Sequence, residues 1–289
     1  MAAKEASVRQ DRMPCGRKGR GGFRSAAVAA AIAVMWPTAC FAWGSEGHKV
    51  IAIIAQSRLD TKATAATRDL LAREGKKDLA DIANWADKVK RYDPSRPLHS
   101  VRIPLNDGAP DWNTLCPISR RPCATRAAAE YISTLCNLSS SAEDKTRALK
   151  YVVHLIGDIH QPLHASSRTG REKVLLGYRR TTLHKVWDTL ILRYTGRTVE
   201  GLAEELASRP GAEELETGGT PQEWALESRD IARDIIFAEL SSFPKVGELV
   251  NLPRGYTVSK RKIVFDRLTQ AGFRLARELN SCLGEGSGT

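Results

Sequence analysis

The pattern of hydrophobic and polar positions in this chain is helical almost throughout. After Trp43, apolar residues recur at steps of three and four, the period of an α-helix with one buried face, at Val50, Ile51, Ile54, Ala55 and Leu59. Similar stripes run through 124–138, 143–158, 198–207, 222–242 and 260–283. Alternating polarity, which is typical of a half-buried strand, is scarce, and 172–178 is the best candidate for a short strand or hairpin arm.

Polar stretches rich in Pro and Gly separate these stripes, at 91–123, 166–182, 208–221 and 243–258, and are expected to connect helices. We find no internal repeat and no low-complexity tract. The sequence therefore predicts one all-α, mostly helical domain over 43–283 with at most a short β-hairpin, followed by a flexible Gly/Ser tail at 284–289.

The first 42 residues have the pattern of an export signal. A basic stretch runs to Arg24, an apolar run spans 26–36, and the small-residue ending Cys40-Phe41-Ala42 follows. The apolar run is much shorter than the roughly 20 residues of a membrane span. We expect cleavage after Ala42, which makes Trp43 the first residue of a secreted or periplasmic protein that is not held at a membrane after processing.

The composition is that of a soluble globular protein, with 42% hydrophobic and 27% charged residues among 289. The formal net charge is +11, and seven basic side chains against two acidic ones lie within residues 1–42. The smaller excess that remains favours anionic partners, although a solvated basic surface accounts for it equally well.

Four cysteines follow the predicted cleavage site: Cys116, Cys123, Cys136 and Cys282. An even number in an exported chain indicates two disulfides, for which three pairings exist. We favour Cys116 with Cys123, which closes a Pro-containing loop, and Cys136 with Cys282, which ties the last helix to the body.

The six histidines carry the strongest chemical signal, because two of them stand four residues before an aspartate. These pairs are His154 with Asp158 and His184 with Asp188. On a helix this spacing places imidazole and carboxylate on one face, one turn apart, where both can reach one cation. Histidine and carboxylate ligands suit zinc, and the candidate ligands exceed what one tetrahedral ion uses, which implies more than one metal.

The motifs resemble those of the zinc-dependent S1/P1 nucleases. They are Trp43-Gly-Ser-Glu-Gly-His48, Trp85-Ala-Asp87, Leu98-His99, the run from His154 to His164 that reads HLIGDIHQPLH, and Leu183-His-Lys-Val-Trp-Asp188. The resemblance spans roughly residues 43 to 283. It implies a mostly helical fold of the phospholipase C/P1 nuclease type with a trinuclear zinc cleft.

The resemblance also implies a set of ligands for each of three Zn²⁺ ions. One ion would take Asp87, His99, His154 and Asp158; its neighbour would take the Trp43 amino nitrogen and carbonyl oxygen, His48 and a bridging Asp158; the third would take His164, His184 and Asp188. The Trp43 amine becomes available only after residues 1–42 are removed. His160 matches a position that is not a ligand and is expected to support the site by hydrogen bonding.

The implied activity is that of a monomeric endonuclease. It would cut single-stranded DNA and RNA to 5′-phosphate products and act on 3′-nucleotides, by attack of zinc-bound hydroxide on the phosphorus. Asp87 and Asp158 would belong to the catalytic centre. An acidic residue that members of the family place shortly after the His99 position has no clean match here, and Asp107 is the nearest candidate for a catalytic role.

The sequence departs from the family pattern between His164 and His184. A Gly-Gly-Asn segment is usual there, whereas this chain has Ser166-Ser-Arg-Thr-Gly-Arg-Glu172 in a shorter loop.

Two other functions are alternatives to a nuclease. Zinc phospholipases C share a similar ligand set, but typically use Glu where this chain has Asp188. A catalytically decayed protein that binds zinc or nucleic acid is the other alternative.

Overall fold

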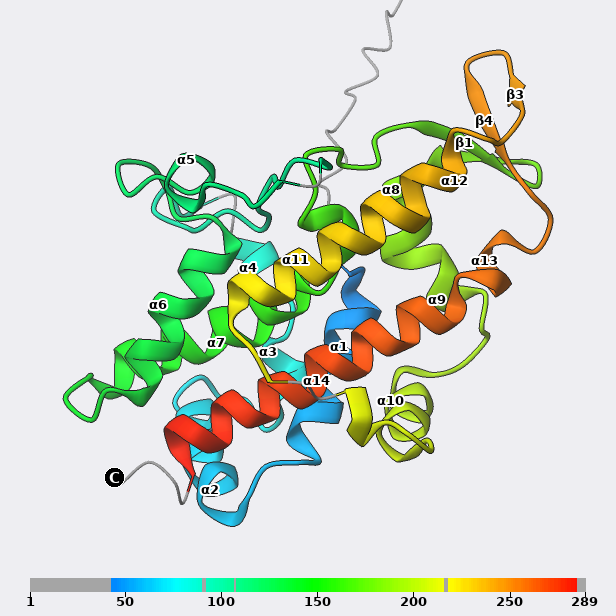
Figure 1. The fold of residues 1–289 in the computed structure, drawn as a ribbon. Coiled ribbons are helices and arrows are strands. Elements are labelled where there is room, and N and C mark those ends of the chain that lie inside the picture. The colour runs from blue at the N-terminus through cyan, green and yellow to red at the C-terminus, as the bar shows by residue number, and fades with distance from the viewer. Residues whose placement is uncertain (1–42, 90–91, 107, 216–217, 285–289) are drawn as a thin grey trace, which may run out of the picture. The chain divides into compact units, whose positions relative to one another are not determined.

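The computed structural model describes residues 43–89, 92–106, 108–215 and 218–284, and these segments belong to one compact unit. The predicted export signal and nearly all of the predicted tail lie outside the described residues. Most of the described chain is helical, which confirms the predicted fold class (Figure 1). No described helix combines the length and the apolar character that crossing a membrane requires.

The helices follow the hydrophobic stripes of the sequence. The longer α-helices are α1 (Ser45–Gln56), α2 (Thr61–Ala72), α6 (Ala124–Cys136), α7 (Ala142–Ile159), α10 (Val199–Ser208), α11 (Pro221–Ile231) and α14 (Arg261–Leu283). Short helices and turns join them: α3 (Leu79–Ile82), α4 (Trp85–Val89), α5 (Trp112–Leu115), η1 (Pro162–His164), α8 (Leu183–Lys185), η2 (Val186–Leu190), α9 (Ile191–Arg193), η3 (Glu213–Leu215), η4 (Ala232–Phe237), α12 (Ala238–Leu240) and α13 (Tyr256–Ser259).

Helix α7 runs through the middle of the domain, and every residue from Ala148 to Ile159 is buried. Ser141 caps its first turn by accepting a hydrogen bond from Asp144 N, and Pro162 prevents the helix from continuing. A helix that is buried on all sides offers polar side chains only to other protein groups or to a bound ion. The imidazole of His154 and the carboxylate of Asp158 are therefore positioned by the core itself.

Helix α14 crosses α1 at close range, as Figure 1 shows for the orange-to-red and blue helices. Gly272 makes this approach possible, because a Cβ atom there would lie 2.5 Å from Ile54 Cγ2 and 3.3 Å from Ile51 O. The disulfide between Cys136 and Cys282 joins the end of α14 to α6. Cys116 and Cys123 form the other disulfide, so both pairings that we favoured from the sequence are present.

The sheet is larger than the single hairpin that the sequence predicted. Strands β1 (Lys173–Leu176) and β2 (Arg179–Thr182) form that hairpin. A second hairpin, β3 (Lys245–Val246) and β4 (Leu249–Leu252), lies in a stretch that we expected to be a connection. Strand β4 pairs in parallel with β1, giving the order β2-β1-β4-β3. Burial of Val250 and Leu252 against the body stabilises a strand whose pairing partner is far away in sequence.

Candidate metal centre

Asp158 is the centre of a cluster of histidines and carboxylates. One of its oxygens lies 3.2 Å from His99 Nδ1 and 3.3 Å from His154 Nε2. The other lies 3.5 Å from His48 Nε2 and 3.8 Å from His164 Nδ1. The carboxylate is fully buried. Its two oxygens therefore face different imidazoles, as expected of a carboxylate that bridges two cations.

Four elements bring the surrounding side chains to Asp158. His48 is on the first turn of α1, Asp87 is on α4, and His154 is one turn before Asp158 on α7. His99 is in the irregular segment between α4 and α5, which is held by two backbone hydrogen bonds, from Leu98 N to Pro122 O and from Val101 N to His164 O. Asp87 lies 3.6 Å from His99 Nδ1 and 3.9 Å from His154 Nε2.

A second cluster contains His164, His184 and Asp188. The Nε2 atoms of the two histidines are 3.2 Å apart, and His184 Nε2 is 3.0 Å from an Asp188 oxygen. The His184-to-Asp188 segment is not a plain α-helix, because α8 passes into the π-helical turn η2. Such π-turns are frequent at functional sites, and here the four-residue spacing still brings both groups to one point.

Backbone carbonyls fix the tautomers of three histidines. Nδ1 of His154 donates to Ala83 O at 2.8 Å, Nδ1 of His164 donates to His99 O at 2.8 Å, and Nδ1 of His184 donates to Thr169 O at 2.6 Å. Their Nε2 atoms then carry lone pairs. Because two lone pairs that face each other cannot form a hydrogen bond, the 3.2 Å contact between His164 and His184 fits a shared cation.

The dimensions and chemistry of these groups fit zinc. Bonds of about 2.0 Å in a tetrahedron place ligand atoms about 3.3 Å apart, close to the separations around Asp158 and His184. Three sets of side chains each have ligand atoms within 4.8 Å of one another: His48, Asp87 and His154; His99, His154 and Asp158; and His164, His184 and Asp188. Mixed imidazole and carboxylate donors of this kind suit Zn²⁺.

Burial disfavours the charged forms of His164 and Asp188 in the second cluster. It holds the pKa of His164 well below its usual value, and the neighbouring His184 acts in the same direction. Burial also raises the pKa of Asp188, against the lowering effects of His184 and Gln161. A bound dication reverses the penalty on the carboxylate and favours neutral imidazole ligands.

The loop that departs from the family pattern holds His184 in place. In addition to the Thr169 carbonyl on the ring, Gly170 O accepts a 2.7 Å hydrogen bond from His184 N. Gly170 adopts φ +66°, which favours glycine, and a Cβ there would lie 3.0 Å from His184 N. Arg168 stacks over Phe237 at 3.9 Å and pairs with Glu172 at 2.7 Å, which fixes the rest of the loop.

Trp43 lies buried beside the second cluster. Gly44 N donates to Asp188 O at 2.7 Å, and a Cβ on Gly47 would lie 2.8 Å from Trp43 Cβ. The start of the predicted mature chain is thus anchored to a candidate ligand. Asp107, the remaining candidate catalytic residue, lies outside the described residues.

His160, to which the resemblance assigns a supporting role, lies buried at the end of α7. Its Nδ1 donates to Ile156 O at 2.7 Å, and its Nε2 accepts from Arg274 at 2.9 Å. Burial, then Arg267 and Arg274, hold its pKa well below the usual value, so the ring is neutral. Glu227 binds both arginines, each at 2.7 Å. This network joins α14 and α11 to the end of α7 that carries the site.

Gln161 belongs to the site, although we predicted no role for it from the sequence. Its side-chain amide donates to an Asp188 oxygen, and its carbonyl oxygen accepts from Leu163 N. The amide thus connects the end of α7 to the second cluster. Gln161 lies within the motif from His154 to His164, but the motif does not indicate that its side chain contacts Asp188.

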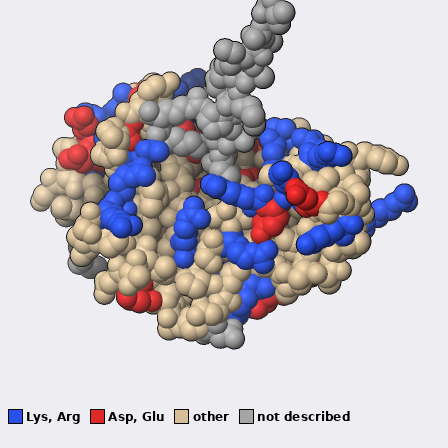
Figure 2. All heavy atoms as spheres, turned by 90° about the horizontal axis from the view of Figure 1, so that it is seen from above, with Lys and Arg blue, Asp and Glu red and all other residues tan. Residues whose placement is uncertain are grey.

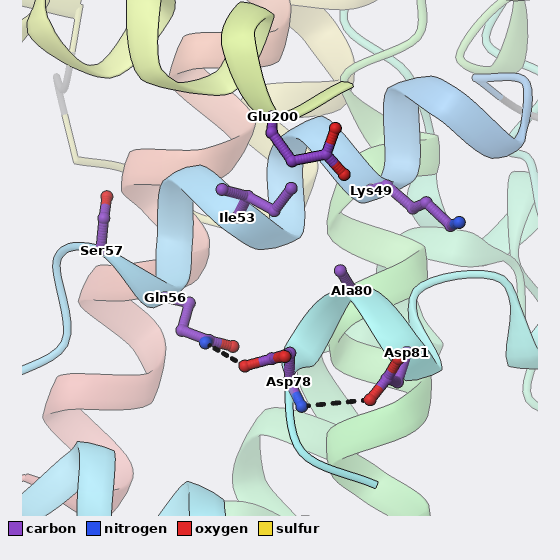
Figure 3. A pocket seen from close by; sticks show the side chains of 8 residues that line it. All are labelled: Lys49, Ile53, Gln56, Ser57, Asp78, Ala80, Asp81 and Glu200. Atoms are coloured by element: carbon purple, nitrogen blue, oxygen red, sulfur yellow. Dashed lines mark hydrogen bonds between the residues drawn. The ribbon is translucent and has the colours of Figure 1, made fainter. Parts of the chain in front are cut away.

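A cavity of about 390 Å³ opens beside both clusters, since Asp87 and Asp188 line it together with Glu46, Lys88, Lys185 and Arg193. A different groove, between α1, α3 and α10, is drawn in Figure 3. Asp78, Asp81 and Glu200 outnumber Lys49 there, and Gln56 already donates to Asp78 at 2.7 Å. The groove of Figure 3 therefore suits an anionic ligand poorly, whereas the cavity beside the clusters combines cations with candidate metal ligands.

Known nucleases are similar in sequence to this chain. The sequence profile of the S1/P1 nucleases matches residues 43–284. Endonuclease 2 of Arabidopsis thaliana is 32% identical over 267 residues, which are 84% of this chain and 91% of that protein. Nuclease S1 of Aspergillus oryzae is 34% identical over 158 residues, or 52% of this chain and 54% of its own. For nuclease P1 of Penicillium citrinum the identity is 32% over 157 residues, 51% and 57% of the two chains. This chain therefore belongs to the S1/P1 nuclease family and is a zinc-dependent nuclease.

Proposed function

We propose that the mature protein begins at Trp43, is secreted or periplasmic, holds three zinc ions, and hydrolyses single-stranded DNA, RNA and 3′-nucleotides. The observation that carries this proposal is the convergence of three imidazoles, those of His48, His99 and His154, on the two oxygens of Asp158, next to the cluster of His164, His184 and Asp188. Two adjoining donor sets that share one carboxylate support closely spaced metals.

The ligands would divide among the ions as the family resemblance implies. Asp87, His99, His154 and Asp158 would hold one ion. Trp43, His48 and Asp158 would hold the second, and His164, His184 and Asp188 the third. When bound, zinc would polarise the phosphoryl oxygens and lower the pKa of the attacking water.

The residues of the chain supply orientation and charge balance. Carbonyls of Ala83, His99 and Thr169 hold three imidazole rings by their Nδ1 atoms, so the rings need no rearrangement when substrate arrives. Asp87, Asp158 and Asp188 return about three negative charges against six on three Zn²⁺ ions. The positive surplus suits a phosphodiester.

The cavity beside the clusters supports an anionic substrate. Lys88, Lys185 and Arg193 line it, and all three are exposed, although Arg193 also pairs with Glu46 at 3.2 Å. Figure 2 shows further Lys and Arg side chains over the face that is seen from above. These cations would attract the phosphate backbone and position one phosphate at the metals. An unpaired strand reaches such a centre more easily than a duplex, whose bases lock the backbone.

The test uses protein that truly begins at Trp43. We expect about three zinc atoms per chain by elemental analysis, cleavage of single-stranded DNA to 5′-phosphate ends, release of phosphate from 3′-AMP, and loss of both activities on chelation. His154→Ala should lose activity together with zinc. Turnover of short-chain phosphatidylcholine without nucleotide release, or zinc binding without hydrolysis of any phosphate ester, would refute the proposal.

A further inference from the structure

Two lysines line the cavity beside the metal centre, and each directly follows a candidate metal ligand. Lys88 comes after Asp87 on α4, and Lys185 comes after His184 on α8. Both side chains are exposed, and neither makes an ion pair with another residue that the structure describes. An exposed lysine without a partner adds little to the stability of a fold. The two ammonium groups are therefore free to bind a ligand in the cavity.

The other charges that line this cavity are already balanced. Arg193, its third cation, pairs with Glu46 at 3.2 Å. The remaining acidic residues of the lining are Asp87 and Asp188, which are candidate metal ligands and would be neutralised by bound dications. Lys88 and Lys185 are thus the charges of the lining that a ligand would have to match.

Residues 44–46 hold the two walls of the cavity together. On one side, Gly44 N donates to Asp188 O at 2.7 Å, in the turn that continues from α8. On the other side, the Asn84 amide, one turn before Lys88, donates to Ser45 O at 3.2 Å and to Ser45 Oγ at 3.1 Å. The backbones that carry the two lysines are therefore fixed before any ligand binds, which lowers the cost of binding.

The lysines flank the metal ligands and do not join them. Consecutive side chains on a helix are about 100° apart and do not face each other, so Lys88 and Asp87 diverge, as do Lys185 and His184. A phosphate that lies at the metal ligands is therefore beside the two ammonium groups and not between them. A second anionic group on the same ligand would reach them.

A nucleotide strand provides such a group at a fixed separation. The phosphate on the 3′ oxygen of a nucleoside has its nearest neighbour on the 5′ oxygen of the same nucleoside. The ammonium group of lysine is a compact charge that suits phosphate. The volume of about 390 Å³ is also in the range of sites for small molecules.

We propose that Lys88 and Lys185 form a second phosphate site, which holds the 5′-phosphate of the nucleoside whose 3′-phosphate lies at the metal ligands. The inference rests on the proposed function and deepens it, because it makes nucleoside 3′,5′-bisphosphates better substrates than 3′-mononucleotides. Hydrolysis of a bisphosphate consumes one water and breaks the bond between phosphorus and the 3′ oxygen. Inorganic phosphate leaves, the 3′ oxygen keeps a proton, and the 5′-phosphate stays on the nucleoside.

The experiment compares three zinc-loaded variants with the wild type. Lys88→Met/Lys185→Met removes both charges but keeps side chains of similar length, and Lys88→Arg/Lys185→Arg keeps both charges. The control, Lys62→Met/Lys77→Met, makes the same change at exposed lysines in and just after α2, which lies apart from α8 in Figure 1. The kcat/KM for release of inorganic phosphate is measured with 3′-AMP and with adenosine 3′,5′-bisphosphate.

We expect the wild type to prefer the bisphosphate about tenfold in kcat/KM at low salt, because each exposed ion pair contributes roughly threefold. The methionine pair should abolish this preference, whereas the arginine pair and the α2 control should keep it. High salt should also reduce the preference of the wild type, because the screening length is only about 3 Å in 1 M salt. Turnover of 3′-AMP should fall much less than turnover of the bisphosphate, and the zinc content should not change.

The ratio of the two substrates separates this site from a merely structural role of the lysines. Equal kcat/KM for both substrates in the wild type, or a methionine pair that keeps the preference, would overturn the second phosphate site. An equal loss on both substrates would overturn it too, since the lysines would then act on the phosphate at the metals alone. If the methionine pair loses zinc or fails to fold, the arginine pair decides, and loss of the preference there overturns the site.

The proposed function is tested separately by the wild type. If it hydrolyses 3′-AMP and single-stranded DNA without preferring the bisphosphate, the second phosphate site is wrong and the proposed function stands. If it hydrolyses neither, the proposed function is wrong, and the second phosphate site is wrong with it.

Discussion

Gly157 lies against the imidazole of His48, so closely that a Cβ atom at position 157 would come within 2.8 Å of His48 Nδ1 and 3.0 Å of its Cε1. The same imidazole stacks on His154, with ring centroids 4.0 Å apart. Helix α7 thus contributes more than His154 and Asp158 to the site. Because Gly157 has no side chain, the His48 imidazole fits between α1 and α7.

Gly157→Ala should therefore displace His48 from Asp158. We expect zinc affinity or activity to fall about tenfold to hundredfold, the usual cost of disturbing the groups that orient metal ligands. Gly272→Ala is the matched control, because its Cβ would also collide with α1, but at Ile54 in the core. That variant should lose about 1–3 kcal/mol of stability through overpacking and keep its zinc. Equal zinc content and equal kcat in both variants would contradict the role given to Gly157.

Gln161→Leu should weaken the second cluster specifically. The substitution keeps a similar volume but removes the amide that donates to Asp188. We expect one zinc to dissociate about tenfold to hundredfold more readily, measured by competition with a chelator. Gln56→Leu removes another glutamine-to-aspartate hydrogen bond, to Asp78 at 2.7 Å, far from any candidate ligand, and should leave all zinc in place. A Gln161→Leu protein with unchanged zinc release would remove Gln161 from the site.

The candidate ligands could be predicted because their spacing follows helix geometry. His154 and Asp158 are one turn apart on α7, so the local rule and the fold agree. His184 and Asp188 converge although η2 is π-helical, because one widened turn shifts a side chain less than the reach of a histidine. Spacing alone did not connect Asp87 to His99, and only the resemblance to a family assigned them.

The backbone groups that orient these ligands had no signal in the sequence. Ala83 and Thr169 act through backbone carbonyls, which every residue possesses, so residue identity cannot reveal them. The β3–β4 hairpin was missed for a related reason. Its partner strand β1 is about 75 residues earlier, and four alternating residues beside Pro244 and Pro253 look like a loop until that pairing is known.

The buried His160 predicts acid sensitivity. Its pKa is lowered in the folded state by burial and by Arg267 and Arg274. Below about pH 6.5, His160 is therefore protonated in the unfolded chain but stays neutral in the folded protein. The free energy of unfolding should fall as the pH falls from about 6.5, by up to about 1.4 kcal/mol per pH unit for this residue. Urea unfolding of the wild type and of His160→Gln between pH 7.5 and 5.5 measures the difference. Zinc loss in acid affects both proteins, so parallel curves would exclude His160 as the cause.

The predicted first residue of the mature chain gives the most direct test of metal loading. If the Trp43 amine is a ligand, one extra residue in front of it turns that amine into an amide, which binds zinc poorly because its lone pair is delocalised. Protein with one added Gly before Trp43 should then bind about one zinc fewer, or release it far faster, and should lose most of its activity. Gly44 N should still donate to Asp188 O, so the fold and its melting temperature should change little.

A protease that removes the extra residue provides the control within one sample, because zinc stoichiometry and activity should return together. Full zinc and full activity in the extended protein would show that the centre is complete without the amine, and that export processing is not coupled to catalysis.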